Sequence, residues 1–157
     1  MLAILDTDIG TDIDDSLALA LILASPEIDL IGITCVYGDV HLRSKIALKY
    51  MQLAGVHDIP VYAGASTPLL NLDKLYWEGH EGHAILTDDD ADLQPNSQFA
   101  VDYLVETILE HPQAIHIIAI GPLTNIAMAL QKAPHIADQI AGLKIMGGVI
   151  RGYDDLS

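Results

Sequence analysis

Five aspartates fall within ten residues near the start of the chain, in the segment DTDIGTDIDD: Asp6, Asp8, Asp12, Asp14 and Asp15. Carboxylates packed this closely repel one another, and the repulsion raises the pKa of each group. Helix capping accounts for one or two of them, because Asp is favoured at a helix N-terminus. A hard divalent cation such as Ca²⁺ or Mg²⁺, which binds several carboxylate and carbonyl oxygens, accounts for the others. The segment therefore predicts a site that binds metal or handles protons.

The acidic segment lies between an apolar run at 2–6, which we expect to be a buried strand, and a run at 13–24 that we expect to be a buried helix. The same alternation continues, with strands expected over 28–37, 60–63, 114–120 and 143–146 and helices over 40–54, 97–110 and 123–131. Apolar strands that alternate with helices predict a doubly wound α/β fold, a mostly parallel sheet with helices on both faces. Ligands of such sheets bind at the carboxyl ends of the strands, where the winding direction reverses.

The amino-acid composition limits the classes of molecule that the chain can bind. The chain has 157 residues, 51% of them hydrophobic, and 22 acidic residues against 7 basic ones give a net charge of -15. A chain this acidic is a poor partner for nucleic acid or for an anionic membrane surface. Cys35 is the single cysteine, which excludes an intrachain disulfide and fits a reducing compartment. The N-terminus lacks the basic region of a signal peptide. We therefore expect a cytoplasmic protein.

The acidic segment and the start of the following helix, residues 6–19, resemble the N-terminal signature of the nucleoside hydrolases, the inosine-uridine preferring ribonucleoside hydrolases. Four further segments are similar to motifs of that family and occur in the same order: 34–40 (TCVYGDV), 77–82 (WEGHEG), 120–127 (IGPLTNIA) and 145–148 (IMGG). Five motifs spread from the N-terminus to residue 148 make the resemblance specific, although each of the last four is weak by itself.

The resemblance implies Ca²⁺-dependent hydrolysis of the N-glycosidic bond of a ribonucleoside, which yields the free base and ribose. Carried over by position, Asp8 and Asp15 would bind the Ca²⁺ ion together with the backbone carbonyl of Ile120. Asp8 would also act as the general base. Asp14 and Asp39 would form hydrogen bonds with the ribose hydroxyls.

The chain departs from the family pattern in three places. A longer spacer between Gly10 and Asp14 contains Asp12, which could take the role assigned to Asp14 or Asp15. Asp39 stands where the family usually has Asn, and it can accept a hydrogen bond from a hydroxyl but cannot donate one. Glu78 stands where many members have His, which leaves the preferred base, purine or pyrimidine, open.

Length is the largest departure, because nucleoside hydrolases are roughly twice as long as this chain and above the usual single-domain size. We expect one α/β domain over residues 1–157 that is truncated at its C-terminus. In the family, the later segments supply a further Asp ligand, a ribose-binding group and the acid that assists the departing base. We therefore expect little or no activity from this chain alone, and a homo-oligomer or a completing chain as a possible partner.

Two other interpretations stay open at this point. A Mg²⁺-dependent phosphatase of the haloacid-dehalogenase type also places an Asp-x-Asp motif after its first strand, here Asp6 and Asp8. Against it, Gly10 stands where that motif usually has Thr or Val, and the acidic chain would repel phosphate. The other interpretation is a metal-binding remnant or subunit of the hydrolase family that has no catalytic activity.

Overall fold

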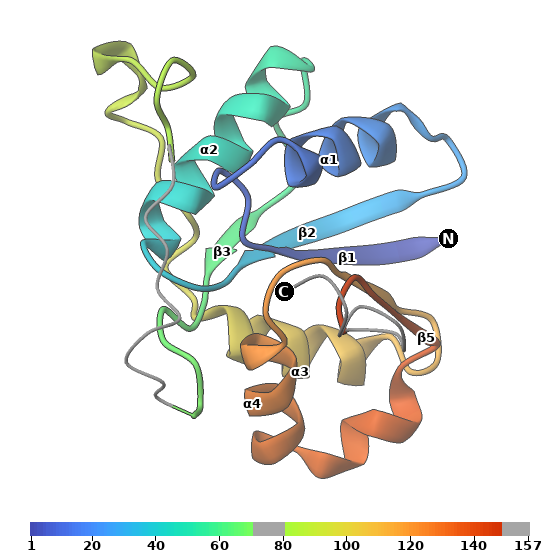
Figure 1. Ribbon diagram of the computed structural model, residues 1–157. Coiled ribbons are helices and arrows are strands. Elements are labelled where there is room, and N and C mark those ends of the chain that lie inside the picture. The colour runs from blue at the N-terminus through green and yellow to red at the C-terminus, as the bar shows by residue number, and fades with distance from the viewer. Residues whose placement is uncertain (71–80, 149–157) are drawn as a thin grey trace, which may run out of the picture.

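A single parallel sheet organises the molecule (Figure 1). The computed structural model describes residues 1–70 and 81–148, and within them five strands lie in the order β3–β2–β1–β4–β5. The strands are β1 (Leu2–Thr7), β2 (Asp29–Cys35), β3 (Val61–Ala63), β4 (His116–Ala119) and β5 (Gly142–Ile145). All four neighbouring pairs are parallel, as the apolar strands predict.

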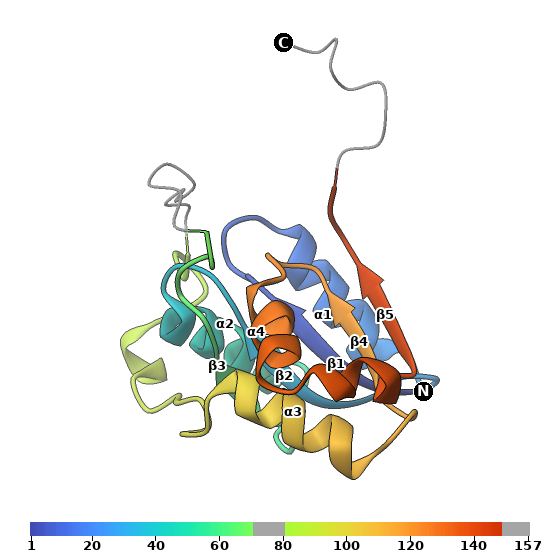
Figure 2. The ribbon, with the colours of Figure 1, turned by 90° about the horizontal axis from the view of Figure 1, so that it is seen from below.

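Helices cover both faces of this sheet, which confirms the expected doubly wound α/β architecture (Figures 1 and 2). On one face lie α1 (Asp14–Ala24) and α2 (Val40–Leu53). On the other lie α3 (Ala100–Glu110), α4 (Thr124–Lys132) and the 3₁₀ helix η2 (Pro134–Gln139). A short 3₁₀ helix, η1 (Asp88–Asp90), lies between β3 and α3 in the chain.

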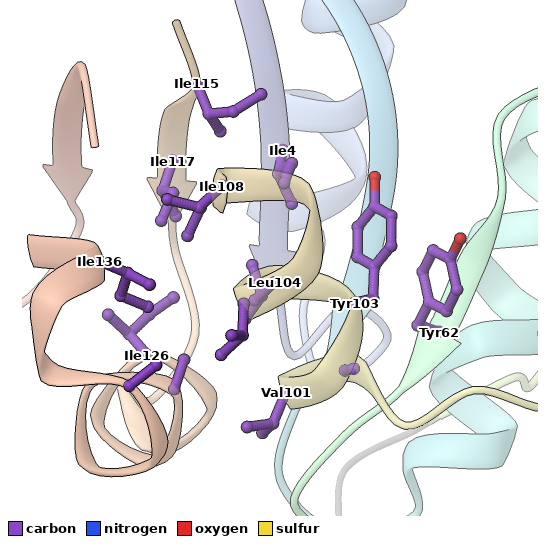
Figure 3. Packing of buried hydrophobic residues seen from close by; sticks show 14 of the residues in the cluster. Ile4, Tyr62, Val101, Tyr103, Leu104, Ile108, Ile115, Ile117, Ile126 and Ile136 are labelled. Carbon is purple, nitrogen blue, oxygen red and sulfur yellow. The ribbon is translucent and has the colours of Figure 1, made fainter. Parts of the chain in front are cut away.

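Alternate residues of the central strand supply the two cores. Ile4 of β1 packs with Leu104 and Ile108 of α3 in the cluster that Figure 3 shows. The next residue, Leu5, belongs to the opposite cluster with Leu19 of α1 and Ile46 of α2. Successive side chains of a strand point to opposite faces, so a continuous apolar run serves both layers.

Helix α1 is less buried than its composition predicts. Leu19 and Ile22 pack against the sheet, whereas Leu17 and Leu21 are 62% and 68% exposed. The expectation of a helix buried all round was therefore wrong, because only one face of α1 has a packing partner among the described residues. Within the part of the chain that is described, no helix has both the length and the apolar character needed to cross a membrane.

Helix α3 begins three residues later than expected. The sequence predicted a helix over 97–110, but the helix starts at Ala100, and Phe99 at its N-cap makes no side-chain capping bond. The reason is that Asn96 pairs with β3: its N–H donates to the carbonyl of Val61 over 2.7 Å. The backbone is still extended at Phe99, where ψ is 136°.

The sheet order fixes where the winding reverses. From β1 the chain moves to β2 and β3 on one side, and it later returns to place β4 and β5 on the other. The carboxyl ends of β1 and β4 therefore lie side by side at the reversal, the place where open α/β sheets bind their ligands.

Candidate metal and active site

A cavity of about 540 Å³ opens at the carboxyl ends of β1 and β4, and both Asp8 and Ile120 line it. The two strand ends are held together because the N–H of Ile120 donates to the carbonyl of Asp6 over 2.8 Å. Gly121 allows the close approach: a Cβ atom there would lie 2.8 Å from the Asp8 nitrogen and 2.9 Å from Asp8 Oδ1. The structure thus brings together two of the three predicted metal ligands.

The third predicted ligand, Asp15, lies in the first turn of α1 and is 4% exposed. The hydroxyl of Thr7 donates a hydrogen bond to its Oδ1. Its backbone N–H donates to Asp14 Oδ1 over 3.0 Å. One carboxylate oxygen from each of Asp12, Asp14 and Asp15 lies within 4.8 Å of the others, so three carboxylates gather at the start of α1.

Electrostatic interactions connect Asp8 with this cluster. Burial, together with the smaller effect of the negative charges of Asp8, Asp14 and Asp12, raises the pKa of Asp15 to about 6, against the hydrogen bond from Thr7. Burial also raises the pKa of Asp8. The four carboxyl groups therefore share one region of strong negative potential.

The exposed pair Asp12 and Asp14 share a hydrogen bond between their side chains. This bond raises the pKa of Asp12 and lowers the pKa of Asp14, so a proton held on Asp12 stabilises the charge of its neighbour. A proton shared by two carboxyl groups occupies the place that a cation can take, because both relieve the same repulsion.

Asp6 lies behind the cavity and is fully buried. Burial raises its pKa to about 7, although two hydrogen bonds to Oδ1 oppose the shift, from Thr34 over 2.5 Å and from Asn125 over 2.8 Å. Its other oxygen, Oδ2, has no hydrogen-bond partner among the described residues.

These donors fit a hard divalent cation. The side chains that gather are the carboxylates of Asp12, Asp14 and Asp15, and Asp8 interacts with them through its charge. Carboxylate oxygens are ligands that Ca²⁺ and Mg²⁺ prefer, and the cluster contains no Cys or His. The raised pKa values of Asp8 and Asp15 show that their charge lacks full compensation within the described chain. A cation at this position would supply that compensation.

Asp39 lies in a different place from the other predicted site residues. Its Oδ1 accepts a hydrogen bond from the N–H of Leu42 over 2.9 Å, so its side chain caps α2. It lines a separate cavity of about 700 Å³ with Ala63, Gly64 and Ser66. The structure therefore does not place Asp39 in the cavity that Asp8 and Ile120 line.

The motif at residues 77–82 lies partly outside the described residues, which resume at Glu81. Glu81 reaches the acidic segment, since the hydroxyl of Thr11 donates to its Oε1 over 3.2 Å. Trp77 and Glu78 lie outside the described residues.

Sequence reasoning missed Arg43, which is 1% exposed. Its guanidinium donates to backbone carbonyls of the acidic segment and lowers the pKa of Asp8 against the effect of burial. A signal was present: Arg43 lies in the first turns of α2, where the helix dipole disfavours a positive charge. A basic residue at such a position indicates a nearby negative partner.

Comparison with known proteins identifies the family of this chain. Residues 3–156 match the profile of the inosine-uridine preferring nucleoside hydrolases. The chain belongs to this family. It is 35% identical to a protein of Arabidopsis thaliana named "Probable uridine nucleosidase 2", over 92% of this chain and 46% of that protein.

Two solved nucleoside hydrolase structures share the fold. A plant nucleoside hydrolase superposes with a TM-score of 0.83 at 36% identity, over 94% of this chain and 48% of that one. A purine-preferring ribonucleoside hydrolase from Gardnerella vaginalis gives a TM-score of 0.82 at 33% identity, over 96% and 50%. The chain therefore spans about half the length of the nucleoside hydrolases it matches. This family membership does not favour the phosphatase interpretation.

Proposed function

We propose that this chain provides a cation-binding catalytic site for hydrolysis of the N-glycosidic bond of a ribonucleoside, with Ca²⁺ as the cation. The observation that carries the proposal is the convergence of Asp8 and Ile120 on one cavity beside the Asp12, Asp14 and Asp15 cluster. Asp8, Asp15 and the carbonyl of Ile120 are the proposed ligands.

Each acidic group has a distinct role in this proposal. A bound divalent cation supplies Lewis acidity, which makes a nearby water more acidic. Asp8 accepts the proton of the water that attacks the anomeric carbon, and its raised pKa suits a base. Asp14 and Asp39 are proposed to bind ribose hydroxyls. For Asp39 this role requires the ribose to extend toward the separate cavity that Asp39 lines.

The charge of the site suits the chemistry of the bond. Cleavage of an N-glycosidic bond builds positive charge on the ribose, and neighbouring carboxylates stabilise that charge in the transition state. The net charge of -15 favours a neutral nucleoside over a nucleotide phosphate. The relatives differ in the base that their names give, uridine in one and purine in another, so the proposal includes no base preference.

Ribose release tests the proposal. The purified chain is incubated with inosine, uridine or a chromogenic riboside, with Ca²⁺ or with a chelator, and free ribose is measured beside phosphate release from a phosphomonoester. We expect slow ribose release that requires Ca²⁺ and disappears in Asp8→Asn. The exposed Asp58→Asn variant serves as the control and should retain it. Phosphate release, or a folded chain with neither Ca²⁺-dependent ribose release nor Ca²⁺-dependent nucleoside binding, would refute the proposal.

A further inference from the structure

Arg43 is the one fully buried basic side chain among residues 1–70 and 81–148. An ionised side chain is costly to bury unless charged or polar groups surround it. The polar groups that contact the guanidinium of Arg43 therefore indicate its role.

The guanidinium of Arg43 reaches from α2 to three loops at once. Nε donates to the carbonyl of Tyr37, over 2.6 Å, in the loop that follows β2. Nη1 donates to the carbonyls of Asp8 and Ile9, the second over 3.1 Å. Nη2 lies 3.5 Å from Oε1 of Glu81.

The two contacts of Nη1 hold the backbone at Asp8, the residue that carries the proposed chemistry. Asp8 and Ile9 lie after the end of β1 and before α1, so neither belongs to a strand or a helix. Nη1 of Arg43 donates to both of these successive carbonyls, and because Nε of the same planar group is hydrogen-bonded to the carbonyl of Tyr37, the guanidinium plane fixes the direction from which Nη1 reaches them. The following residue, Gly10, packs against the same helix: a Cβ atom there would lie 2.6 Å from Ile46 Cδ1.

We propose that Arg43 is a positioning residue of the site, which holds the backbone of Asp8 and Ile9 so that the Asp8 carboxylate faces the carbonyl of Ile120. This inference rests on the proposed function, because it assigns Arg43 a role in presenting Asp8. A shift of the Asp8 backbone alters the cavity that Asp8 and Ile120 line, although Arg43 itself does not line that cavity.

The test compares Arg43→Lys with Lys45→Met, a control on the same helix whose Nζ contacts the carbonyl of Ala91 over 3.3 Å. Lys keeps the positive charge but cannot reproduce the planar fork. For each variant, Ca²⁺ affinity is measured by calorimetry, kcat and KM are measured separately, and urea unfolding gives the stability.

For Arg43→Lys we expect Ca²⁺ affinity and kcat each to fall on the order of tenfold or more, as when a residue that orients metal ligands is lost. KM should change much less than kcat, and Lys45→Met should match the wild type in all three quantities. Should Arg43→Lys fail to fold, Arg43→Gln stabilised by trimethylamine N-oxide takes its place.

A wild-type Ca²⁺ dissociation constant and kcat in a destabilised Arg43→Lys would show that the residue serves only the core, and the proposal would fail. Failure of the proposed function is distinguishable from this result. If the proposed function fails, the wild type releases no ribose. The Ca²⁺ dissociation constants of the wild type and of Arg43→Lys can still be compared, so the role of Arg43 is tested independently.

Discussion

The side-chain amide of Asn125 donates a hydrogen bond to Oδ1 of Asp6 over 2.8 Å, and this bond joins the end of β1 to the first turn of α4. The same amide nitrogen lies 3.2 Å from the carbonyl of Cys35, at the end of β2. Asn125 Oδ1 accepts from the N–H of Ala65, just beyond β3, over 2.8 Å. One buried side chain thus connects the carboxyl ends of three neighbouring strands, the edge of the sheet that carries the site.

Asn125→Ala should therefore destabilise the protein strongly. The variant leaves the buried N–H of Ala65 without this partner, which costs about 1–3 kcal/mol. It also removes one hydrogen bond each from the carbonyl of Cys35 and from Asp6 Oδ1, which keep those from Gly64 and Thr34. We expect the free energy of unfolding, measured with urea, to fall by roughly 2–5 kcal/mol. Gln131→Ala, on an exposed position of the same helix, should change it by less than about 0.5 kcal/mol. A loss below about 1 kcal/mol for Asn125→Ala would contradict this account of the connection.

Asp15 should contribute more to cation binding than its exposed neighbours. Thr7 holds its carboxylate in place and it is almost fully buried, so its oxygens need no reorganisation on binding. We expect Asp15→Asn to weaken Ca²⁺ affinity on the order of tenfold or more and Asp12→Asn to weaken it less. Calorimetric titration of the chelator-stripped variants measures both effects. If Asp12→Asn has the larger effect, the spacer residue rather than Asp15 holds the cation.

The sequence predicted the parts of the site that depend on chain order. An apolar strand followed by acidic residues, and a fold whose winding reverses beside that strand, were enough to place Asp8 and Ile120 at one edge of the sheet. Arg43 was missed because periodicity describes which side of a helix is buried, not which polar group a long side chain reaches. The separation of Asp39 from Asp8 depends on the cavities that loops form, which no local pattern encodes.

The pKa of Asp6 predicts an unusual pH dependence for the metal-free chain. Burial raises this pKa from 3.8 to about 7 in the folded state, so between these values the folded chain binds more protons than the unfolded one. The free energy of unfolding therefore falls as the pH rises through this interval, by at most roughly 4 kcal/mol. Urea unfolding in the presence of a chelator, repeated from pH 4 to about pH 8, measures the slope.

Asp6→Asn is the matched variant, because Asn is neutral and its oxygen can still accept from Thr34 and Asn125. The slope between pH 6 and 7 should flatten in Asp6→Asn, whereas the part below pH 6, where Asp15 also contributes, should persist. Asp58→Asn, an exposed substitution, should keep the wild-type slope. An unchanged slope in Asp6→Asn would show that another group causes the pH dependence.

Strand β5 should promote self-association of this chain. It is the last strand in the sheet order, and Ile145 and Met146 at its end are 50% and 52% exposed. An edge strand with exposed apolar residues pairs readily with another chain, and a second Lys beside the exposed Lys144 of β5 would oppose that pairing further. In sedimentation velocity we expect the weight-average sedimentation coefficient of the wild type to rise with concentration, and Ile145→Lys to reduce the rise. Leu53→Lys, at a position on α2 that is 67% exposed, should behave as the wild type does. Equal concentration dependence in all three proteins would place the contact elsewhere on the surface.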